Sequence, residues 1–412
     1  MLSRILFSIL LIIAQFSLTN AQTTISVEET VKAALGHHPL RSAADAAVAE
    51  TRGELSASLS PEPPQIALEY EGIPSNSGLS DHEAKKLSLS QGFEFPLKTM
   101  IRYQQGKTNL DRSYLEKSIL LLDLEKLTRE VFIDAWSLQE EVKILRENAV
   151  ALAEYSASVA RMNELGGAAL LDLKRAQVES LIAGRELQSA ETRKNAALAE
   201  LEMITGLETG SAELEYPAAD YPGIVNKTSS DYQQDSNPET NLTEFETLIA
   251  GYETKLAASG WLPDLEISYF QQNVPAENDP DFWGVEFGIS VPLWFWVGNR
   301  GEIQSAKAHR RIIDAEHQNT IMEQTILWNA ACAGLQNSYD QFTLFENEVL
   351  PLALNTSVLA EKNYHLGAAS YLDVVDARKN YLEYKLESVE IAAGLYRNII
   401  QLDRLSGKSI IN

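Results

Sequence analysis

This sequence contains the same phrase twice. LGGAALLDLKRA at residues 165–176 returns as LGAASYLDVVDA at residues 366–377, and ITG (204–206) and LSG (405–407) keep the same spacing, each at the end of a long helical pattern. Motifs that recur in one order are typical of a duplicated structural unit. We therefore expect two copies of one unit, each with its helices in the same register.

Each copy is predicted to contain a helix, a strand, a loop, a second strand and two long helices. The strands carry two further matches, GFEFPL (92–97) with GISVPL (288–293), and PQIALEY (64–70) with PDLEISY (263–269). The predicted division of the chain is repeat 1 at 22–206 (strand pair about 64–96, hairpin tip about 165–171), an irregular connector at 207–240, and repeat 2 at 241–412 (strand pair about 263–293, tip about 366–372). The connector is predicted to carry little regular structure because 215–240 is rich in Pro, Ser, Asn and Asp.

The first 21 residues have the pattern of a secretory signal peptide. One cation, Arg4, precedes an apolar run that is too short to span a bilayer, and small residues lead to a predicted cleavage after Ala21. The chain is therefore predicted to be exported. Its single cysteine, Cys332, excludes an intramolecular disulfide, and we expect this side chain to be a small buried apolar group rather than a reactive thiol.

The strands alternate apolar and polar residues, so each presents one apolar and one polar face. A hairpin packed on a soluble core would have the same pattern. Two features favour outer-membrane strands: a length of about ten residues, and an aromatic group of Trp294, Phe295 and Trp296 that resembles a membrane-interface girdle. Four strands cannot close a barrel, so we expect copies of the chain to associate, with the polar loops 71–86 and 271–282 outside the cell.

The remaining sequence is typical of long helices. Charged and apolar residues recur at helical spacing from Leu97 to Tyr216, where no proline occurs. A helix over residues 99–164 would be about 100 Å long at 1.5 Å per residue. In the second copy, Pro351 predicts a break or kink in the corresponding arm.

Composition and motifs exclude several functions. The formal net charge of -24 excludes nucleic-acid binding. No nucleotide-binding or catalytic motif occurs, so we expect neither an enzyme nor a cofactor. No metal site is predicted, because the pair His37 and His38 has no accompanying ligand cluster and the five methionines are scattered.

With its signal peptide, doubled strand pairs and doubled LG-x-A-x-x-LD phrases, the chain resembles the TolC-like outer-membrane efflux proteins, and most closely their heavy-metal (CzcC/CusC) branch. The resemblance implies a mostly α fold with a small β part: a trimeric 12-stranded outer-membrane β-barrel that continues into a periplasmic α-helical barrel. It also implies a passive exit duct that contacts outer-membrane lipid and a periplasmic adaptor. Through the adaptor, the duct would dock to an inner-membrane pump of the resistance-nodulation-division type that exports heavy-metal cations.

The repeated phrase would form the tip of each helical hairpin. Gly166, Gly167 and Gly367 suit a turn with positive φ, and the alanines allow close approach. The resemblance implies that the tips dock to the adaptor through Leu165, Gly166, Gly167 and Ala168 in the first copy and Leu366, Gly367, Ala369 and Ser370 in the second.

Acidic residues follow both tips. Asp373 and Asp376 are three positions apart and share a helix face, and Asp172 stands in the first copy. A solvated acidic helix start explains them most simply. The resemblance instead implies that they line a closed periplasmic gate, with Tyr364 and Asp172 bonded between hairpins, although Ala369 replaces the arginine that a family gate uses there.

Two alternatives remain open. The same channel could serve general drug efflux or type I protein secretion, because the pump and adaptor choose most of the substrate. A trimeric coiled-coil surface protein would explain export and long helices, but it would not explain duplicated strand pairs.

Overall fold

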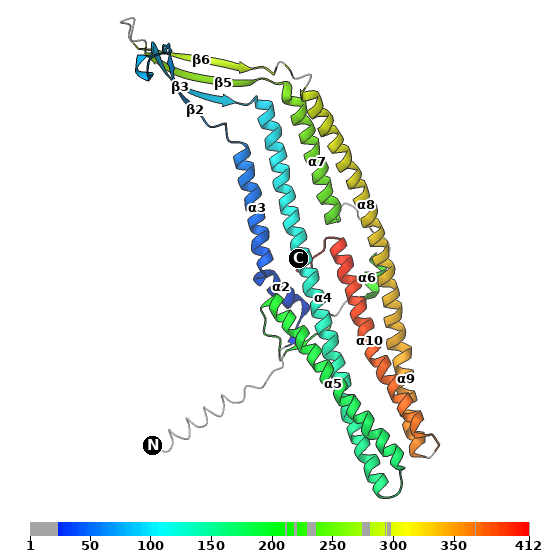
Figure 1. Cartoon of the computed structure of the whole chain (residues 1–412). Coiled ribbons are helices and arrows are strands. Elements are labelled where there is room, and N and C mark those ends of the chain that lie inside the picture. Colours follow the sequence, from blue (N-terminus) through cyan, green and yellow to red (C-terminus); the bar gives the residue numbers. More distant parts are fainter. Residues whose placement is uncertain are drawn as a thin grey trace, which may run out of the picture. The chain divides into compact units, whose positions relative to one another are not determined.

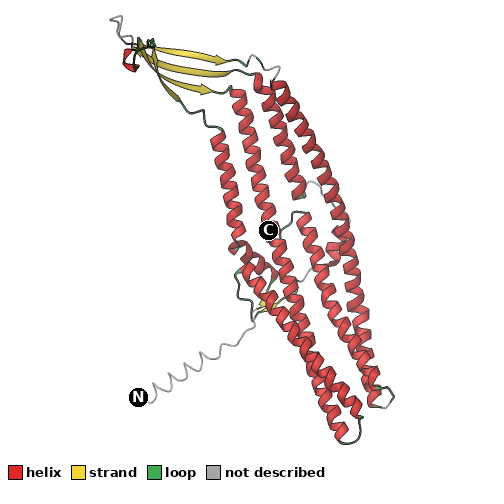
Figure 2. Cartoon of the chain, viewed as in Figure 1, coloured by secondary structure: helices red, strands yellow, loops and turns green. Residues whose placement is uncertain are grey.

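The computed structural model describes residues 24–210, 212–217, 221–228, 236–273, 281–292, 294, 298–366 and 368–411. The predicted signal peptide lies outside the described residues. The fold is mostly helical with a small part in strands, as expected (Figure 2). Within the part described, no helix is both long enough and apolar enough to cross a membrane.

The chain divides into two compact units. One comprises 42–119 and 234–325, and the other comprises the segments up to 41, 120–233 and 326–412. The first, the strand unit, contains the sheet, and the second, the hairpin unit, contains both hairpin tips (Figure 1).

The strand unit is built around one antiparallel sheet with the order β2-β3-β5-β6. The strands are β2 (Gln65–Glu71), β3 (Ala84–Phe93), β5 (Asp264–Asn273) and β6 (Phe282–Ser290). Strands β3 and β5 join the two sequence copies, with Leu89 opposite Tyr269. The outer edges of the sheet are therefore β2 and β6.

The two faces of this sheet differ in polarity, as the alternation predicts. The apolar face is exposed, and Ile66 and Phe287 are 77% and 76% accessible. Its other exposed members are Leu68, Leu87, Leu89, Phe93, Leu265, Ile267, Tyr269, Trp283, Val285 and Ile289. A large exposed apolar face has to be covered by a partner or by lipid.

Each pair of strands is preceded and followed by helices in sequence. The strand unit contains most of α3 (Pro39–Ser58), the first part of α4 (Pro96–Glu164), α7 (Pro238–Ala258) and the first part of α8 (Gly298–Leu344). Short 3₁₀ turns lie at Leu79–Asp81 and Ser259–Trp261. Lys98 on α4 binds Asp264 at the start of β5 with an N–O distance of 2.8 Å, which ties the helix to the sheet.

The hairpin unit contains the remaining elements. They are β1 (Thr24–Ile25), α2 (Val27–His37), α5 (Leu170–Thr205), β4 (Glu213–Leu214), α6 (Tyr221–Thr228), α9 (Leu350–His365) and α10 (Tyr371–Leu405), together with the rest of α4 and α8. Strand β1 pairs in parallel with β4. Ser26 begins α2 with a capping box completed by Glu29.

The core of the hairpin unit lies where α2, α4, α5, α8 and α10 meet. Phe132, Leu201, Leu395 and Ile400 are at most 1% accessible. Cys332 is half-buried at the margin of this core, where it packs as an apolar side chain. Burial of such side chains contributes about 1.5–3 kcal/mol each, so this core is the main source of stability in the unit.

The two long arms differ in regularity. Helix α4 runs unbroken for 69 residues, whereas α8 gives way to a π-helical turn at Phe345–Val349 before α9. Pro351 stands in the first turn of α9. The N–H group that proline lacks would have no partner within α9 at this position. The predicted interruption is therefore a π turn directly before the proline, and the chain continues as a helix beyond it.

The described part of 207–240 carries more regular structure than predicted. This segment includes β4, α6 and the first residues of α7. Its Asn and Pro residues act as start signals: the Asn237 side chain accepts a hydrogen bond from the Thr240 N–H, and Pro238 occupies the first turn. Residues 211, 218–220 and 229–235 lie outside the described residues.

Candidate functional site

The first hairpin tip lies between α4 and α5. Gly166 has a φ of 75°, and the Gly167 N–H donates to the Met162 carbonyl at 2.8 Å. The Asn163 amide donates to the Ala168 carbonyl at 2.8 Å, which closes the turn from the other side. Leu165 is 88% accessible at the apex. This tip therefore presents an apolar side chain on a well-bonded turn.

The glycine prediction is confirmed at one position and wrong at another. Gly166 has the left-handed conformation that favours glycine. Gly167 does not, and a Cβ there would lie 3.6 Å from the Met162 carbonyl oxygen, which is an ordinary contact. Gly367 lies outside the described residues.

The second tip lies between α9 and α10. The Ala368 and Ala369 N–H groups both donate to the Asn363 carbonyl, at 2.8 and 3.3 Å. Leu366 is 73% accessible, so this tip also presents an apolar side chain. The two tips share a sequence motif and a turn-closing hydrogen bond, because Ala368 and Asn363 occupy the positions of Gly167 and Met162 in the first tip.

Asp373 begins α10 as part of a capping box. Its carboxylate accepts hydrogen bonds from the N–H and hydroxyl of Ser370, both at 2.8 Å, and its own N–H donates to the Ser370 hydroxyl oxygen at 3.3 Å. These bonds lower the pKa of Asp373, which keeps its carboxylate ionised. The geometry thus supports the simpler interpretation of Asp373 as a helix start. Asp376 is exposed one turn further along α10.

Behind the tips lies a group of aromatic residues of which the sequence analysis named only Tyr364. The rings of Tyr155 and Tyr371 stack with centroids 5.8 Å apart, and Tyr364 meets Tyr371 edge-on at 6.4 Å. The Arg378 guanidinium lies 5.6 Å from the Tyr155 centroid and pairs with Glu361 at 3.1 Å. These contacts join α4, α9 and α10 just behind the second tip.

Two of the predicted gate residues, Tyr364 and Asp172, affect the pKa values of tyrosines in this group. Burial, followed by the neighbouring Tyr364, raises the pKa of Tyr155. Burial, with the charges of Glu179 and Asp172, raises the pKa of Tyr371. Tyr364 and Asp172 are thus brought to the same tyrosine, and a bond between them across neighbouring hairpins stays a prediction. A groove of about 760 Å³ between α4, α5 and α10 borders the group.

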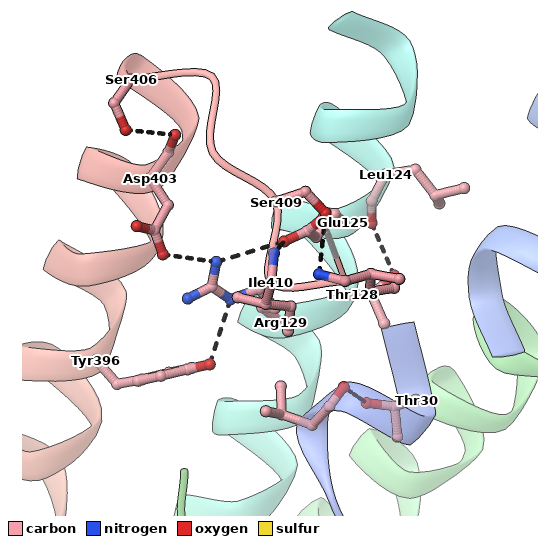
Figure 3. Close-up of polar contacts among 12 residues, drawn as sticks. Thr30, Leu124, Glu125, Thr128, Arg129, Tyr396, Asp403, Ser406, Ser409 and Ile410 are labelled. Atoms are coloured by element: carbon pink, nitrogen blue, oxygen red, sulfur yellow. Dashed lines mark hydrogen bonds and ion pairs between the residues drawn. The ribbon is translucent and has the colours of Figure 1, made fainter. Parts of the chain in front are cut away.

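A second missed feature is a buried polar cluster where α4 meets α10 (Figure 3). Arg129 is 2% accessible; its guanidinium pairs with Asp403 at 2.9 Å and Glu125 at 3.6 Å, and its Nε donates to the Tyr396 hydroxyl at 3.2 Å. Burial of Asp403 raises the pKa of its carboxyl group more than the guanidinium lowers it. The cluster links the first arm to the last helix.

The same cluster holds the C-terminal segment. The Glu125 carboxylate accepts from the Ser409 hydroxyl at 2.6 Å and from the Ile410 N–H at 2.9 Å (Figure 3). The spacing of Glu125 and Arg129 resembles an ordinary surface pair on a helix, so their burial leaves no local signal. The partners of Glu125 in the C-terminal segment lie about 280 residues further along the chain.

The remaining predicted sites are placed only in part. Trp294 is 73% accessible between β6 and α8, whereas Phe295 and Trp296 lie outside the described residues. Across the described part of the chain, no group of three or more His, Cys, Asp or Glu side chains could hold a metal ion.

Comparison with known proteins shows which proteins this chain resembles in sequence and in fold. Residues 235–408 match the family model of the outer membrane efflux protein. The cobalt-zinc-cadmium resistance protein CzcC of Cupriavidus metallidurans is 21% identical over 294 residues, which cover 69% of this chain and 68% of CzcC. The structure of CusC superposes with a TM-score of 0.76 at 15% identity, covering 93% of this chain and 92% of CusC. Residues 235–408 thus resemble the outer membrane efflux protein family, and the chain shares the fold of CusC.

A further solved structure has the same fold. VceC from Vibrio cholerae matches with a TM-score of 0.77 at 15% identity, over 94% of this chain and 97% of VceC. VceC is an outer membrane protein, and CusC forms a transmembrane channel. The likeness to CzcC and CusC agrees with the heavy-metal branch expected from the motifs.

Proposed function

We propose that this protein is the outer-membrane exit duct of a tripartite system that expels heavy-metal cations. In this proposal three copies form a 12-stranded barrel and a periplasmic helical barrel, and an adaptor connects the tips to a resistance-nodulation-division pump. The pump supplies the energy, and the duct is a passive gated conduit. The cobalt-zinc-cadmium resistance named for CzcC supports the substrate class.

The main support for the proposal is the sheet. Its two edge strands, β2 and β6, would leave backbone N–H and C=O groups unpaired in a bilayer, where each unsatisfied group costs several kcal/mol. Its apolar face is exposed along all four strands. Association of copies would pair the edges and turn this face toward lipid, and three copies supply the 12 strands of a closed barrel.

The tips supply the proposed docking and gating surfaces. Leu165 and Leu366 are exposed apolar anchors that suit an adaptor hairpin. Asp376, which is exposed and outside the capping box, is the better candidate for a charge facing the pore. Asp373 would act on the gate indirectly, by fixing the start of α10. Tyr364 and Asp172 remain the proposed contact between neighbouring hairpins.

The deciding experiment is the susceptibility of a deletion strain to zinc, cobalt, copper and silver, tested beside dyes, detergents and antibiotics. We expect sensitivity to metals alone, restored by the wild-type gene and less by Asp376→Asn. Sensitivity to organic compounds alone would contradict the metal assignment and favour drug efflux. Crosslinking of the detergent-solubilised protein should give a trimer, and a monomer or tetramer would contradict the proposed barrel.

A further inference from the structure

The polar face of the sheet carries one feature that general polarity does not explain. Phe270 on β5 is an aromatic side chain on this face, between Ser88 on β3 and Gly284 on β6. The ammonium of Lys86 on β3 lies 4.6 Å from the centroid of its ring. The three residues Lys86, Phe270 and Gly284 are called the lysine shelf below.

The ring is seated on the glycine. A Cβ added to Gly284 would lie 2.5 Å from the Phe270 Cζ and 2.8 Å from its Cε1, closer than carbon atoms approach. Phe270 can therefore lie flat across β6 only because position 284 has no side chain. An aromatic ring over a glycine in the neighbouring strand stabilises a sheet and fixes the ring.

The fixed ring determines where the lysine points. Lys86 pairs directly with Glu69 on β2 and with Gln272 on β5. Its ammonium reaches the Phe270 ring, so the side chain leans toward β5 and away from the carboxylate on β2. A cation over an aromatic face is held by the ring quadrupole while it stays charged and hydrated on its other sides.

The polar face is acidic at both ends, and Lys86 is its one cation within the four strands. Asp264, Glu266 and Glu286 lie toward the helical end of the sheet. Lys86 is the third residue of β3, near the loop that joins β2 to β3. Glu69, directly opposite Lys86, and Glu71 lie at the same loop end, so Lys86 is a single positive charge among carboxylates there.

We infer that Lys86, held on Phe270, is a selectivity-determining residue of the pore that opposes entry of cations from outside the cell. The inference rests on the proposed function, in which the polar face lines the pore and the β2–β3 loop is extracellular. In a trimer, three ammonium groups would stand at one level near the outer mouth. They would offset the Glu69 carboxylates at the same level and so weaken the attraction of this mouth for external cations.

The test is ion selectivity of the purified full-length protein in planar bilayers under a KCl gradient. Lys86→Gln should raise the cation-to-anion permeability ratio about twofold in 0.1 M salt, as expected for three unit charges about 10 Å from the axis and screened over one Debye length. The matched control is Lys85→Gln, since Lys85 is exposed on the opposite face of the same strand. It should leave the ratio unchanged, and equal ratios for the two variants would overturn the inference.

Two variants separate the ring from the charge. Phe270→Tyr keeps the aromatic face and should retain the wild-type ratio, whereas Phe270→Leu should move it toward that of Lys86→Gln. Gly284→Ala should act like Phe270→Leu, because its Cβ displaces the ring. A wild-type ratio in Phe270→Leu would mean that the ring does not position the lysine.

Thiol labelling distinguishes failure of this inference from failure of the proposed pore. In a Cys332→Ala background, Ser88→Cys on the polar face should react in intact cells with a membrane-impermeant maleimide, and Leu87→Cys on the apolar face should not. Labelling of Leu87→Cys alone would contradict the pore itself. The expected labelling combined with equal ratios for Lys86→Gln and Lys85→Gln would reject only the role of the lysine shelf.

Discussion

Replacing Arg129 by methionine should destabilise the hairpin unit more than any change to a surface ion pair. The guanidinium is 2% accessible and is shared by Asp403 and Glu125, whose side chain is 4% accessible. Its loss leaves two carboxylates without their cation, one of them buried, and breaking a buried pair from one side costs about 3–5 kcal/mol.

This cost converts to a melting temperature. Unfolding entropy is about 2.1 cal/mol/K per residue, so the 412 residues give about 0.9 kcal/mol/K, and the loss lowers Tm by about 3–6 °C. The assay is the loss of helical circular dichroism on heating the detergent-solubilised oligomer at one fixed scan rate, because unfolding of such assemblies is often irreversible. Adding Glu125→Gln to Arg129→Met should restore part of the loss, since it removes the uncompensated charge.

Arg397 provides a matched control. It also joins α4 to α10, with Asp134 at 2.7 Å and Glu390 at 2.8 Å, but its side chain is 36% accessible. Surface pairs of this kind contribute about 0–1 kcal/mol, so Arg397→Met should shift Tm by about 1 °C or less. Equal shifts for the two methionine variants would refute the argument that burial makes the Arg129 cluster important.

Further predictions concern two helix ends and the interior of α5. Gly206→Ala should cost about 1–2 kcal/mol in thermal unfolding, because Gly206 has a φ of 72° and an added Cβ would lie 3.0 Å from the His37 ring. Gly184→Ala in the open interior of α5 should instead stabilise by about 0.5–1 kcal/mol, and the reverse order would contradict the conformational reasoning. Ser370→Ala should cost about 1 kcal/mol at the start of α10, seen as faster amide hydrogen exchange over residues 371–374, and unchanged exchange there would show that the capping box is dispensable. Because the folded state lowers the pKa of Asp373, its capping contribution should be present above the ordinary carboxyl pKa of 3.8 and lost as the pH falls through the lower folded value. Asp373→Asn should abolish this pH dependence of exchange, after correction for intrinsic rates, and persistence in that variant would assign it to another group.

Elements with a strong period could be predicted from the sequence alone. The alternation in β3 and β6 fixes their faces, because a strand side chain reverses direction at every residue. The first arm is predictable because helical spacing continues without proline until Glu164. The start of α6 and α7 was missed because the same Pro and Asn residues serve both turns and helix starts.

The site was harder to predict for two physical reasons. At Ser370 and Asp373 the capping-box spacing is visible in the sequence, but a carboxylate three residues after a serine can equally face a pore, and only the geometry shows its hydrogen bonds. Around Arg129 the partners are far apart in sequence, so no local pattern marks the cluster. Contacts between copies of the chain are a property of the assembly rather than of one chain's periodicity.

The pairing of β1 with β4 has a consequence for the order of folding. Thr24 and Ile25 find their partners at Glu213 and Leu214, so this parallel pair closes only after about 190 intervening residues are available. The α4–α5 hairpin, by contrast, needs only contacts between residues that follow one another around a short turn. Contacts that are near in sequence form sooner than distant ones. A chain whose N-terminus is synthesised first would thus form its first helical hairpin before Thr24 and Ile25 are paired. These two residues would join the structure late and would not nucleate folding.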